Sequence, residues 1–144
     1  MTARILVVDD DKAFRGMLVE ALLEKGFEVE TAGSAEEGIR LAGSGGFDLV
    51  LQDVMLPGMS GIDAIPLLKA ADPLADIVVM TAFSSKDSAV EALKRGAYDY
   101  FTKPFSLTEM EVVIRRALER RRLQSQVQAL RTSLEREGPL SRII

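Results

Sequence analysis

Short apolar runs alternate with amphipathic stretches along this 144-residue chain up to Pro104, and this alternation restricts its fold more than any other feature. Strands that are covered on both faces are continuously apolar, whereas the covering helices carry apolar residues on one side only. The pattern therefore predicts five βα units and a parallel sheet with helices on both faces. The expected strands span residues 4–8, 28–32, 48–52, 76–80 and 98–102.

Helix signals between the runs support this architecture. Ser34 with Glu37, and Ser106 with Glu109, have the spacing of a capping box, which satisfies the first unpaired N–H groups of a helix. Only the run at 28–32 alternates polar and apolar residues, which predicts an edge strand. Because crossovers are right-handed, we expect a three-layer doubly wound (βα)5 sheet of the flavodoxin-like α/β class. Its predicted strand order is 2-1-3-4-5, with an extended C-terminal helix.

The composition removes several classes of chemistry. The chain has no cysteine and no histidine. This excludes Ser-His and Cys-His catalysis, disulfides, and metal sites built on thiolate or imidazole. No apolar stretch approaches the roughly 18 to 20 residues that cross a bilayer, and residues 1–4 lead directly into a strand. We expect a cytoplasmic protein that makes no membrane contact.

Polar residues stand where the buried strands are expected to end. They follow the first, third, fourth and fifth runs, and they are Asp9 and Asp10, Asp53, Thr81, and Lys103. In a parallel sheet these ends meet at one edge, close to the point where the winding reverses. Three carboxylates in one cleft repel one another and require a cation. Because their ligands are oxygens only, the expected ion is Mg²⁺, held by Asp9 and Asp10 beside Asp53.

The same residues fit the transfer of a phosphoryl group to a carboxylate. A carboxylate is nucleophilic without a base, so the protein mainly supplies positioning and neutralises charge. Asp53 is the predicted acceptor, Lys103 is expected to stabilise the phosphoryl oxygens, and the Thr81 hydroxyl is expected to donate to one of them. The added negative charge would draw Thr81 and its loop inward, which converts a covalent mark into a change of shape.

Four motifs resemble those of response-regulator receiver domains: ILVVDDD at 5–11, DVMLPGMSG at 53–61, TA at 81–82 and YFTKPF at 100–105. The resemblance covers residues 1–120 with the motifs in the expected order. It implies that a sensor histidine kinase phosphorylates Asp53. It also implies that Asp9, Asp10, Asp53 and the backbone carbonyl of Met55 hold Mg²⁺.

The resemblance further implies how the signal leaves the site. Thr81 and Tyr100 are the implied switch pair, and Lys103 is the implied phosphate-contacting lysine, followed by a cis peptide to Pro104. The surface of helix 4, strand 5 and helix 5 is then expected to change. The implied role is regulatory rather than enzymatic, with at most self-catalysed phosphoryl transfer and autodephosphorylation. The bulk of Met55 and Phe83 suggests the hypothesis that water attacks the phosphoryl group slowly.

Other interpretations explain fewer of these residues. A helix cap accounts for Asp11, but not for Asp53 or Lys103. A Mg²⁺-dependent phosphohydrolase that passes through an aspartyl phosphate is a second interpretation. Haloacid-dehalogenase-like phosphatases of this kind have an aspartate two residues after the nucleophile as acid and base, where this chain has Met55. A nucleotide or flavin binder needs hydrogen-bond donors in the loop after the first strand, where this chain has acids. An interaction module whose pocket is never phosphorylated remains open.

The segment after residue 120 has a different pattern. Residues 121–137 favour continuation of the fifth helix, with spacings of 4, 3 and 4 between Leu123, Val127, Leu130 and Leu134. These are the spacings of the apolar seam of a coiled coil. Because a lone helix with such a narrow stripe has little to bury, we expect a homodimer formed through helix 5 and this linker. The alternative is a single helix that frays in solvent.

Arginines are dense near the start of this segment: Arg115, Arg116, Arg120, Arg121 and Arg122. Helical geometry distributes them around the axis, within reach of Glu111 and Glu119. This predicts a solvated face or salt bridges within a dimer rather than a nucleic-acid-binding surface.

Gly138 and Pro139 are expected to break the helix, so residues 138–144 would begin the connection to a downstream domain. The stretch from Arg121 to Ile144 resembles the linker that enters the ATPase domain of NtrC-like activators of σ54-dependent transcription. This resemblance implies that DNA is contacted only through a missing domain, and that the chain regulates transcription through it.

Overall fold

Five parallel strands form one sheet of order β2-β1-β3-β4-β5 in the computed structural model, which describes residues 3–82, 86–103 and 105–143. Side chains are described up to Leu134, apart from that of Lys86. The predicted strand order is confirmed. The strands are β1 (Arg4–Val8), β2 (Glu28–Ala32), β3 (Leu49–Asp53), β4 (Asp76–Thr81) and β5 (Asp99–Thr102).

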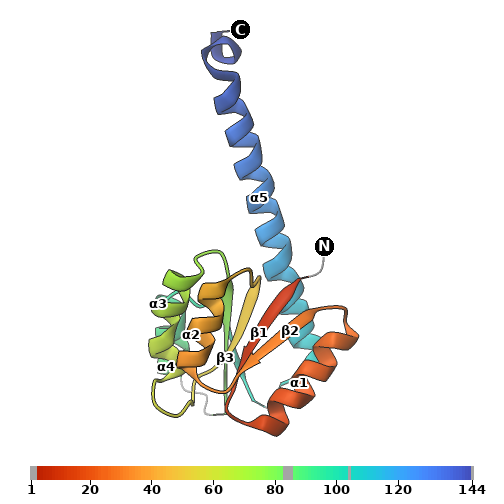
Figure 1. Ribbon diagram of the computed structural model, residues 1–144, viewed down its shortest axis with the longest axis vertical. Coiled ribbons are helices and arrows are strands. Elements are labelled where there is room, and N and C mark those ends of the chain that lie inside the picture. The colour runs from red at the N-terminus through yellow and green to blue at the C-terminus, as the bar shows by residue number, and fades with distance from the viewer. Residues whose placement is uncertain (1–2, 83–85, 104, 144) are drawn as a thin grey trace.

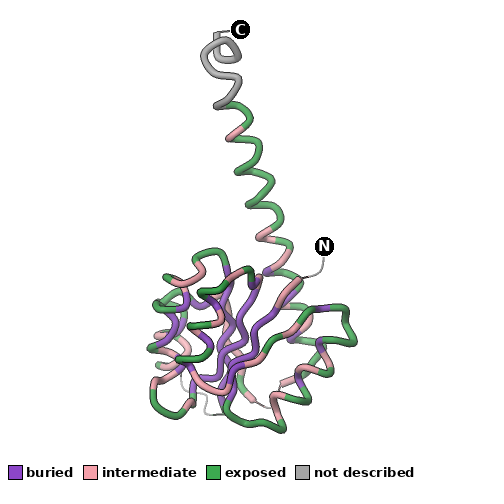
Figure 2. Tube along the Cα trace, in the orientation of Figure 1, coloured by how far each residue is buried: buried purple, intermediate pink, exposed green. Residues whose placement is uncertain are grey.

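Helices cover both faces of the sheet (Figure 1). They are α1 (Lys12–Glu24), α2 (Ala35–Ser44), α3 (Gly61–Ala71), α4 (Lys86–Lys94) and α5 (Leu107–Ile143). Successive β1 side chains point to opposite faces, as the strand period requires. Ile5 and Val7 pack with α1 and α5, whereas Leu6 and Val8 pack with α2 and α3. Figure 2 shows the result, with buried strands between partly exposed helices.

The helix starts and the sheet edge agree with the sequence patterns. Ser34 Oγ accepts a hydrogen bond from the Glu37 N–H at 3.2 Å, and Glu37 accepts one from the Gly33 N–H at 3.3 Å. Ser106 Oγ accepts from the Glu109 N–H at 3.4 Å. At the sheet edge, β2 alternates between exposed and covered residues, which confirms its prediction as an edge strand.

Strands β3 and β4 each run one residue further than predicted. Asp53 pairs with Met80, and Thr81 pairs with Thr102 in the parallel ladder. Both functional candidates are therefore the last residues of their strands rather than the first residues of loops. Their backbones are fixed by the ladder, which restricts where their side chains can point.

Helix α5 is 37 residues long and extends far beyond the sheet (Figure 1). It continues through Gly138 and Pro139 to Ile143, so the predicted break at these residues is wrong. A proline inside a helix removes one backbone hydrogen bond, but a helix that is already formed does not pay the nucleation cost again. None of the described helices combines the length and the hydropathy that a membrane span requires.

Candidate functional site

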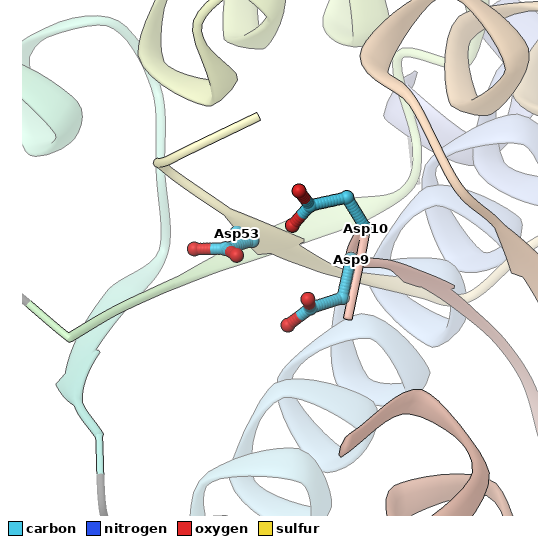
Figure 3. Close-up of side chains that lie close together, drawn as sticks. All are labelled: Asp9, Asp10 and Asp53. Atoms are coloured by element: carbon cyan, nitrogen blue, oxygen red, sulfur yellow. The ribbon is translucent and has the colours of Figure 1, made fainter. Parts of the chain in front are cut away.

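Three carboxylates converge where β1 and β3 end. Candidate ligand oxygens of Asp9, Asp10 and Asp53 all lie within 4.8 Å of one another (Figure 3). Asp9 is fully buried and Asp53 is 5% exposed, whereas Asp10 is exposed to solvent. The cluster therefore has two buried oxygen donors at its base and one at its mouth, which suits a hard divalent ion that retains water.

Lys103 enters this cluster from the end of β5. Its Nζ lies 2.5 Å from Asp9 Oδ2 and 3.3 Å from Asp53 Oδ2. The ammonium group also lies 4.1 Å from the centroid of the Phe14 ring, in a cation–π contact. Among the described residues, one lysine faces the three carboxylates, so the cluster keeps an excess of negative charge.

The charge excess affects the acid–base behaviour of Asp53. Burial raises the pKa of the Asp53 carboxyl, and the neighbouring Asp9 raises that pKa further. Lys103, and the Met55 N–H that donates to Asp53 Oδ1 at 3.2 Å, oppose this effect. The net rise means that Lys103 and this N–H do not offset the effects of burial and of Asp9, and a bound cation would lower the Asp53 pKa.

Local hydrogen bonds hold Asp9 in place and separate its role from that of Asp11. Asp9 Oδ1 accepts from the Asp11 N–H at 2.9 Å, and Arg15 donates to the Asp9 backbone carbonyl at 2.7 Å. Asp11 is the N-cap of α1 and accepts from the N–H groups of Ala13 and Phe14. The capping interpretation therefore holds for Asp11, while Asp9 and Asp10 face Asp53.

The loop after β3 folds tightly back onto Asp53. The Gly61 N–H donates to the Val54 carbonyl at 3.0 Å, and a Cβ added at Gly61 would lie 1.9 Å from the Asp53 carbonyl oxygen. Gln52 is fully buried, and its Nε2 donates to the Gly61 carbonyl at 3.4 Å. These two residues shape the loop that carries Met55. Sequence reasoning assigned a turn here but no such role to Gly61 or Gln52.

A family model for the response regulator receiver domain matches residues 5–115. The chain belongs to this family. The matched range contains the three carboxylates, Thr81, Tyr100 and Lys103, so the site lies within the matched region. Receiver domains are regulatory modules of two-component systems, and this chain is one of the type found in NtrC-like transcriptional regulators.

Individual relatives support the family assignment. The chain is 44% identical over 116 residues to the DNA-binding transcriptional regulator NtrC of Azospirillum brasilense, over 81% of this chain and 24% of that protein. It resembles the CheY-like receiver domain protein of Methanospirillum hungatei JF-1, with a TM-score of 0.83 and 30% identity, over 86% of this chain and 99% of that one.

A third relative shows the family in a modified state. A response regulator from Burkholderia pseudomallei matches with a TM-score of 0.75 and 32% identity, over 95% of this chain and 75% of that one. Its structure contains a phosphorylated aspartic acid, a calcium ion and citrate. Curated relatives are much longer than this receiver domain, which spans 24% of NtrC from Azospirillum brasilense.

The proposed switch residues of this receiver domain lie on β4 and β5. Thr81 is buried at the same sheet edge as Asp53. Tyr100 pairs with Val79 and is half-buried against the core cluster shared by α2 and α3. The Tyr100 hydroxyl is buried and has no hydrogen-bond partner among the described residues. The cis peptide predicted at Pro104 and the role predicted for Phe83 lie outside the described residues.

The arginines of α5 divide into two groups. Arg115 pairs with Glu111 at 3.6 Å and Arg122 with Glu119 at 2.6 Å, both along the helix, as predicted for a solvated face. Arg120 and Arg121 instead bind carboxylates of the domain body. For these two the prediction of a solvated face was wrong, because their partners come from distant parts of the sequence.

The seam predicted on α5 is uncovered in the single chain. Exposed fractions of its side chains run from 47% to 65%: Leu123 49%, Val127 47%, Leu130 65% and Leu134 61%. The four residues lie on one stripe of the receiver domain's extended helix. Nothing within the described part of the chain packs over this stripe enough to bury it.

Proposed function

We propose that this receiver domain accepts a phosphoryl group from a sensor histidine kinase on Asp53. The observation that supports the proposal most is the convergence of Asp9, Asp10 and Lys103 on that one buried carboxylate. A lone buried carboxylate would tend to stay protonated, whereas one next to cations can attack phosphorus. The family assignment supports the same role.

Mg²⁺ is the proposed cofactor, held by Asp9, Asp10, Asp53 and the backbone carbonyl of Met55. The donor set fits, because candidate ligand oxygens of three carboxylates lie within 4.8 Å of one another, and because burial and then the neighbouring Asp9 raise the Asp53 pKa. When bound, Mg²⁺ would neutralise charge on the phosphoryl oxygens. Calcium in the Burkholderia pseudomallei regulator is a hard divalent ion of the same preference for oxygen.

The chain's own residues would carry out the transfer as follows. An Asp53 carboxylate oxygen attacks phosphorus in the kinase's phosphohistidine, and a P–O bond forms as the P–N bond breaks. The imidazole leaves with the bonding electron pair and takes a proton from water. Lys103 pairs with a phosphoryl oxygen, and the Thr81 hydroxyl donates to another. Met55 has no proton to donate, so only self-catalysed transfer and slow loss of the phosphoryl group are expected.

The output is proposed to run through β4 and β5 to α5. Thr81 and Tyr100 would reposition in response to the added charge and alter the surface of α4, β5 and α5. The seam of Leu123, Val127, Leu130 and Leu134 would form a homodimer whose geometry responds to this change. A missing domain would then contact DNA and regulate σ54-dependent transcription. Because relatives such as NtrC bind DNA, we propose that the protein acts in the cytoplasm.

Incubation with acetyl phosphate and Mg²⁺ tests the proposal without the kinase. We expect the intact mass of the wild-type chain to rise by one phosphoryl group. Asp53→Asn should show no gain, whereas Asp63→Asn, which changes an exposed carboxylate on α3, should gain as the wild type does. A wild-type chain that binds Mg²⁺ but gains no mass would instead identify an interaction module with an unused pocket.

A further inference from the structure

Helix α5 leaves the domain at the edge of the sheet where the strands begin, opposite the acid cluster (Figure 1). Two consecutive arginines contact that edge. The Arg120 guanidinium lies 2.5 Å from Asp76, the first residue of β4. Arg121 pairs with Asp48, the residue before β3. The two ion pairs, Arg120–Asp76 and Arg121–Asp48, are called the clasp below.

Both carboxylates of the clasp are held by the domain body. Asp76 is only 7% exposed, and Arg120 lies over the Tyr98 ring at 4.8 Å from its centroid. The second oxygen of Asp48 accepts from the Arg4 N–H at 2.8 Å, which connects it to the start of β1. Because a buried carboxylate is costly without its cation, Asp76 fixes where Arg120 must lie.

Beyond the clasp the helix stands free of the domain. The residues at 122–131 are all exposed, as the green segment above the domain in Figure 2 shows. A groove of about 1230 Å³ separates this part of α5 from the loops at Leu74 and Gly96. Between the described residues, no hydrogen bond or ion pair joins the helix beyond Arg121 to the domain body. As far as side chains are described, up to Leu134, the clasp is therefore the last polar attachment of the linker.

We propose that the clasp fixes the direction in which the linker helix leaves the receiver domain. It holds the helix to β3 and β4, the two strands whose other ends are Asp53 and Thr81. Strands paired in a ladder move as rigid units, so a displacement at the phosphorylation site reaches Asp48 and Asp76 through a few residues of hydrogen-bonded backbone. The role of the clasp in signalling rests on the function proposed above for Asp53. Its role in fixing the direction of the linker helix does not.

Distances between two spin labels measure the direction of the linker helix in the unphosphorylated protein. The chain has no cysteine, so Glu20→Cys on α1 and Ser133→Cys on α5 provide two specific labels at exposed positions. Labelled protein is diluted in excess unlabelled protein, which removes distances between subunits. Position 133 lies about 18 Å beyond Arg121 along the helix, so a tilt of about 20° at the clasp displaces the label by about 6 Å.

We expect a narrow distance distribution in the otherwise wild-type chain and a shifted or broadened one in Arg120→Gln/Arg121→Gln. Arg121→Gln alone should give part of the effect, and it is the milder variant if the double variant unfolds, since Asp48 is less buried than Asp76. Arg122→Gln is the matched control, because its partner Glu119 lies on the same helix. Distances that stay unchanged in folded Gln variants, or that change equally in the control, would overturn the proposal.

A second measurement tests the signalling role separately. Beryllofluoride, which mimics an aspartyl phosphate, should shift the 20–133 distance in the otherwise wild-type chain but not in Arg120→Gln/Arg121→Gln. Binding of beryllofluoride to all variants is checked by their thermal stabilisation. If beryllofluoride binds neither the wild type nor the variants, the function proposed for Asp53 is contradicted. The clasp is then tested by the spin-label distances measured in the absence of beryllofluoride. Binding with equal shifts in all proteins would contradict the signalling role alone.

Discussion

The raised pKa of Asp53 has an effect on protein stability that can be measured as a function of pH. Because its pKa is raised in the folded chain, the native state keeps a proton on Asp53 to higher pH than the unfolded chain does. The wild type therefore loses stability as pH rises from the ordinary carboxyl value of 3.8 through the raised native pKa. Above that window the ionised Asp53 stays buried beside Asp9 at full cost.

Asp53→Asn should remove this cost. In Mg²⁺-free buffer at about pH 7 we expect the variant to be more stable by about 1 kcal/mol, which raises Tm by roughly 3 °C in a domain of this size. At about pH 4 the difference should shrink, because a larger fraction of the wild-type Asp53 carboxyl is then protonated. Thermal melts of both proteins across this range are the measurement. A wild type that is more stable than Asp53→Asn at about pH 7 without Mg²⁺ would contradict the raised pKa of Asp53.

Gly61, the first residue of α3, packs closely against the backbone of Asp53. A Cβ there would lie 1.9 Å from the Asp53 carbonyl oxygen, so Gly61→Ala must displace backbone. We expect a loss of about 3 kcal/mol or more in urea unfolding, and slower phosphorylation by acetyl phosphate. Gly16→Ala is the control. A Cβ at this exposed position of α1 meets nothing within 4 Å, and it should stabilise by about 0.5 to 1 kcal/mol. Equal effects of the two substitutions would contradict the assigned role of Gly61.

Sequence could predict the convergence of Asp9, Asp10, Asp53 and Lys103, because each stands at the end of a run whose position in a parallel sheet is fixed by topology. It could not predict the contacts of Gly61 and Gln52. These depend on the path of a loop backbone, which no periodicity encodes. The exposed position of Asp10 and the buried position of Asp9 also follow from the turn at the end of β1 rather than from residue type.

Among the elements, the start of α1 has three consecutive aspartates with two different roles. Asp11 caps the helix, whereas Asp9 and Asp10 are proposed ligands of the ion. Asp11→Ala should lower the free energy of unfolding by about 1 kcal/mol, the usual loss of an N-cap, and leave Mg²⁺ affinity nearly unchanged. Asp10→Asn should weaken Mg²⁺ binding at least about tenfold without loss of stability in metal-free buffer. Melts and Mg²⁺ titrations of both variants separate the roles. Equal loss of Mg²⁺ affinity in the two variants would contradict this division.

The elements differ in how far sequence determines them. Buried strands are short and continuously apolar, so their order and approximate ends were predicted. The end of α5 was not, because Gly138 and Pro139 are statistical helix breakers whose effect depends on the helix around them. The partners of Arg120 and Arg121 were also missed. Asp48 and Asp76 come next to these arginines only after β3 and β4 are placed beside α5, whereas Glu111 and Glu119 are visible at helical spacing.

At the scale of the whole molecule, the uncovered seam on α5 predicts self-association. We expect wild-type protein to form a dimer in light scattering. Leu130→Glu should weaken the dimer by about 3 kcal/mol, roughly 100-fold in Kd, because each subunit would bury an unpaired charge. Gln126→Glu, an exposed position outside the seam, is the matched control. A wild type that is monomeric with and without beryllofluoride, or a Leu130→Glu dimer of unchanged affinity, would contradict pairing through the seam.

The proposed function requires this molecule to store its signal as one phosphoryl group on Asp53. Borohydride reduction after treatment with acetyl phosphate and Mg²⁺ converts an aspartyl phosphate to homoserine, and tryptic mapping locates the change. The tryptic peptide 41–69 contains Asp53 together with Asp48 and Asp63, which serve as internal controls. We expect homoserine at position 53 alone, and only when Mg²⁺ is present during the treatment. Homoserine at another aspartate, or none in folded protein that binds Mg²⁺, would contradict it.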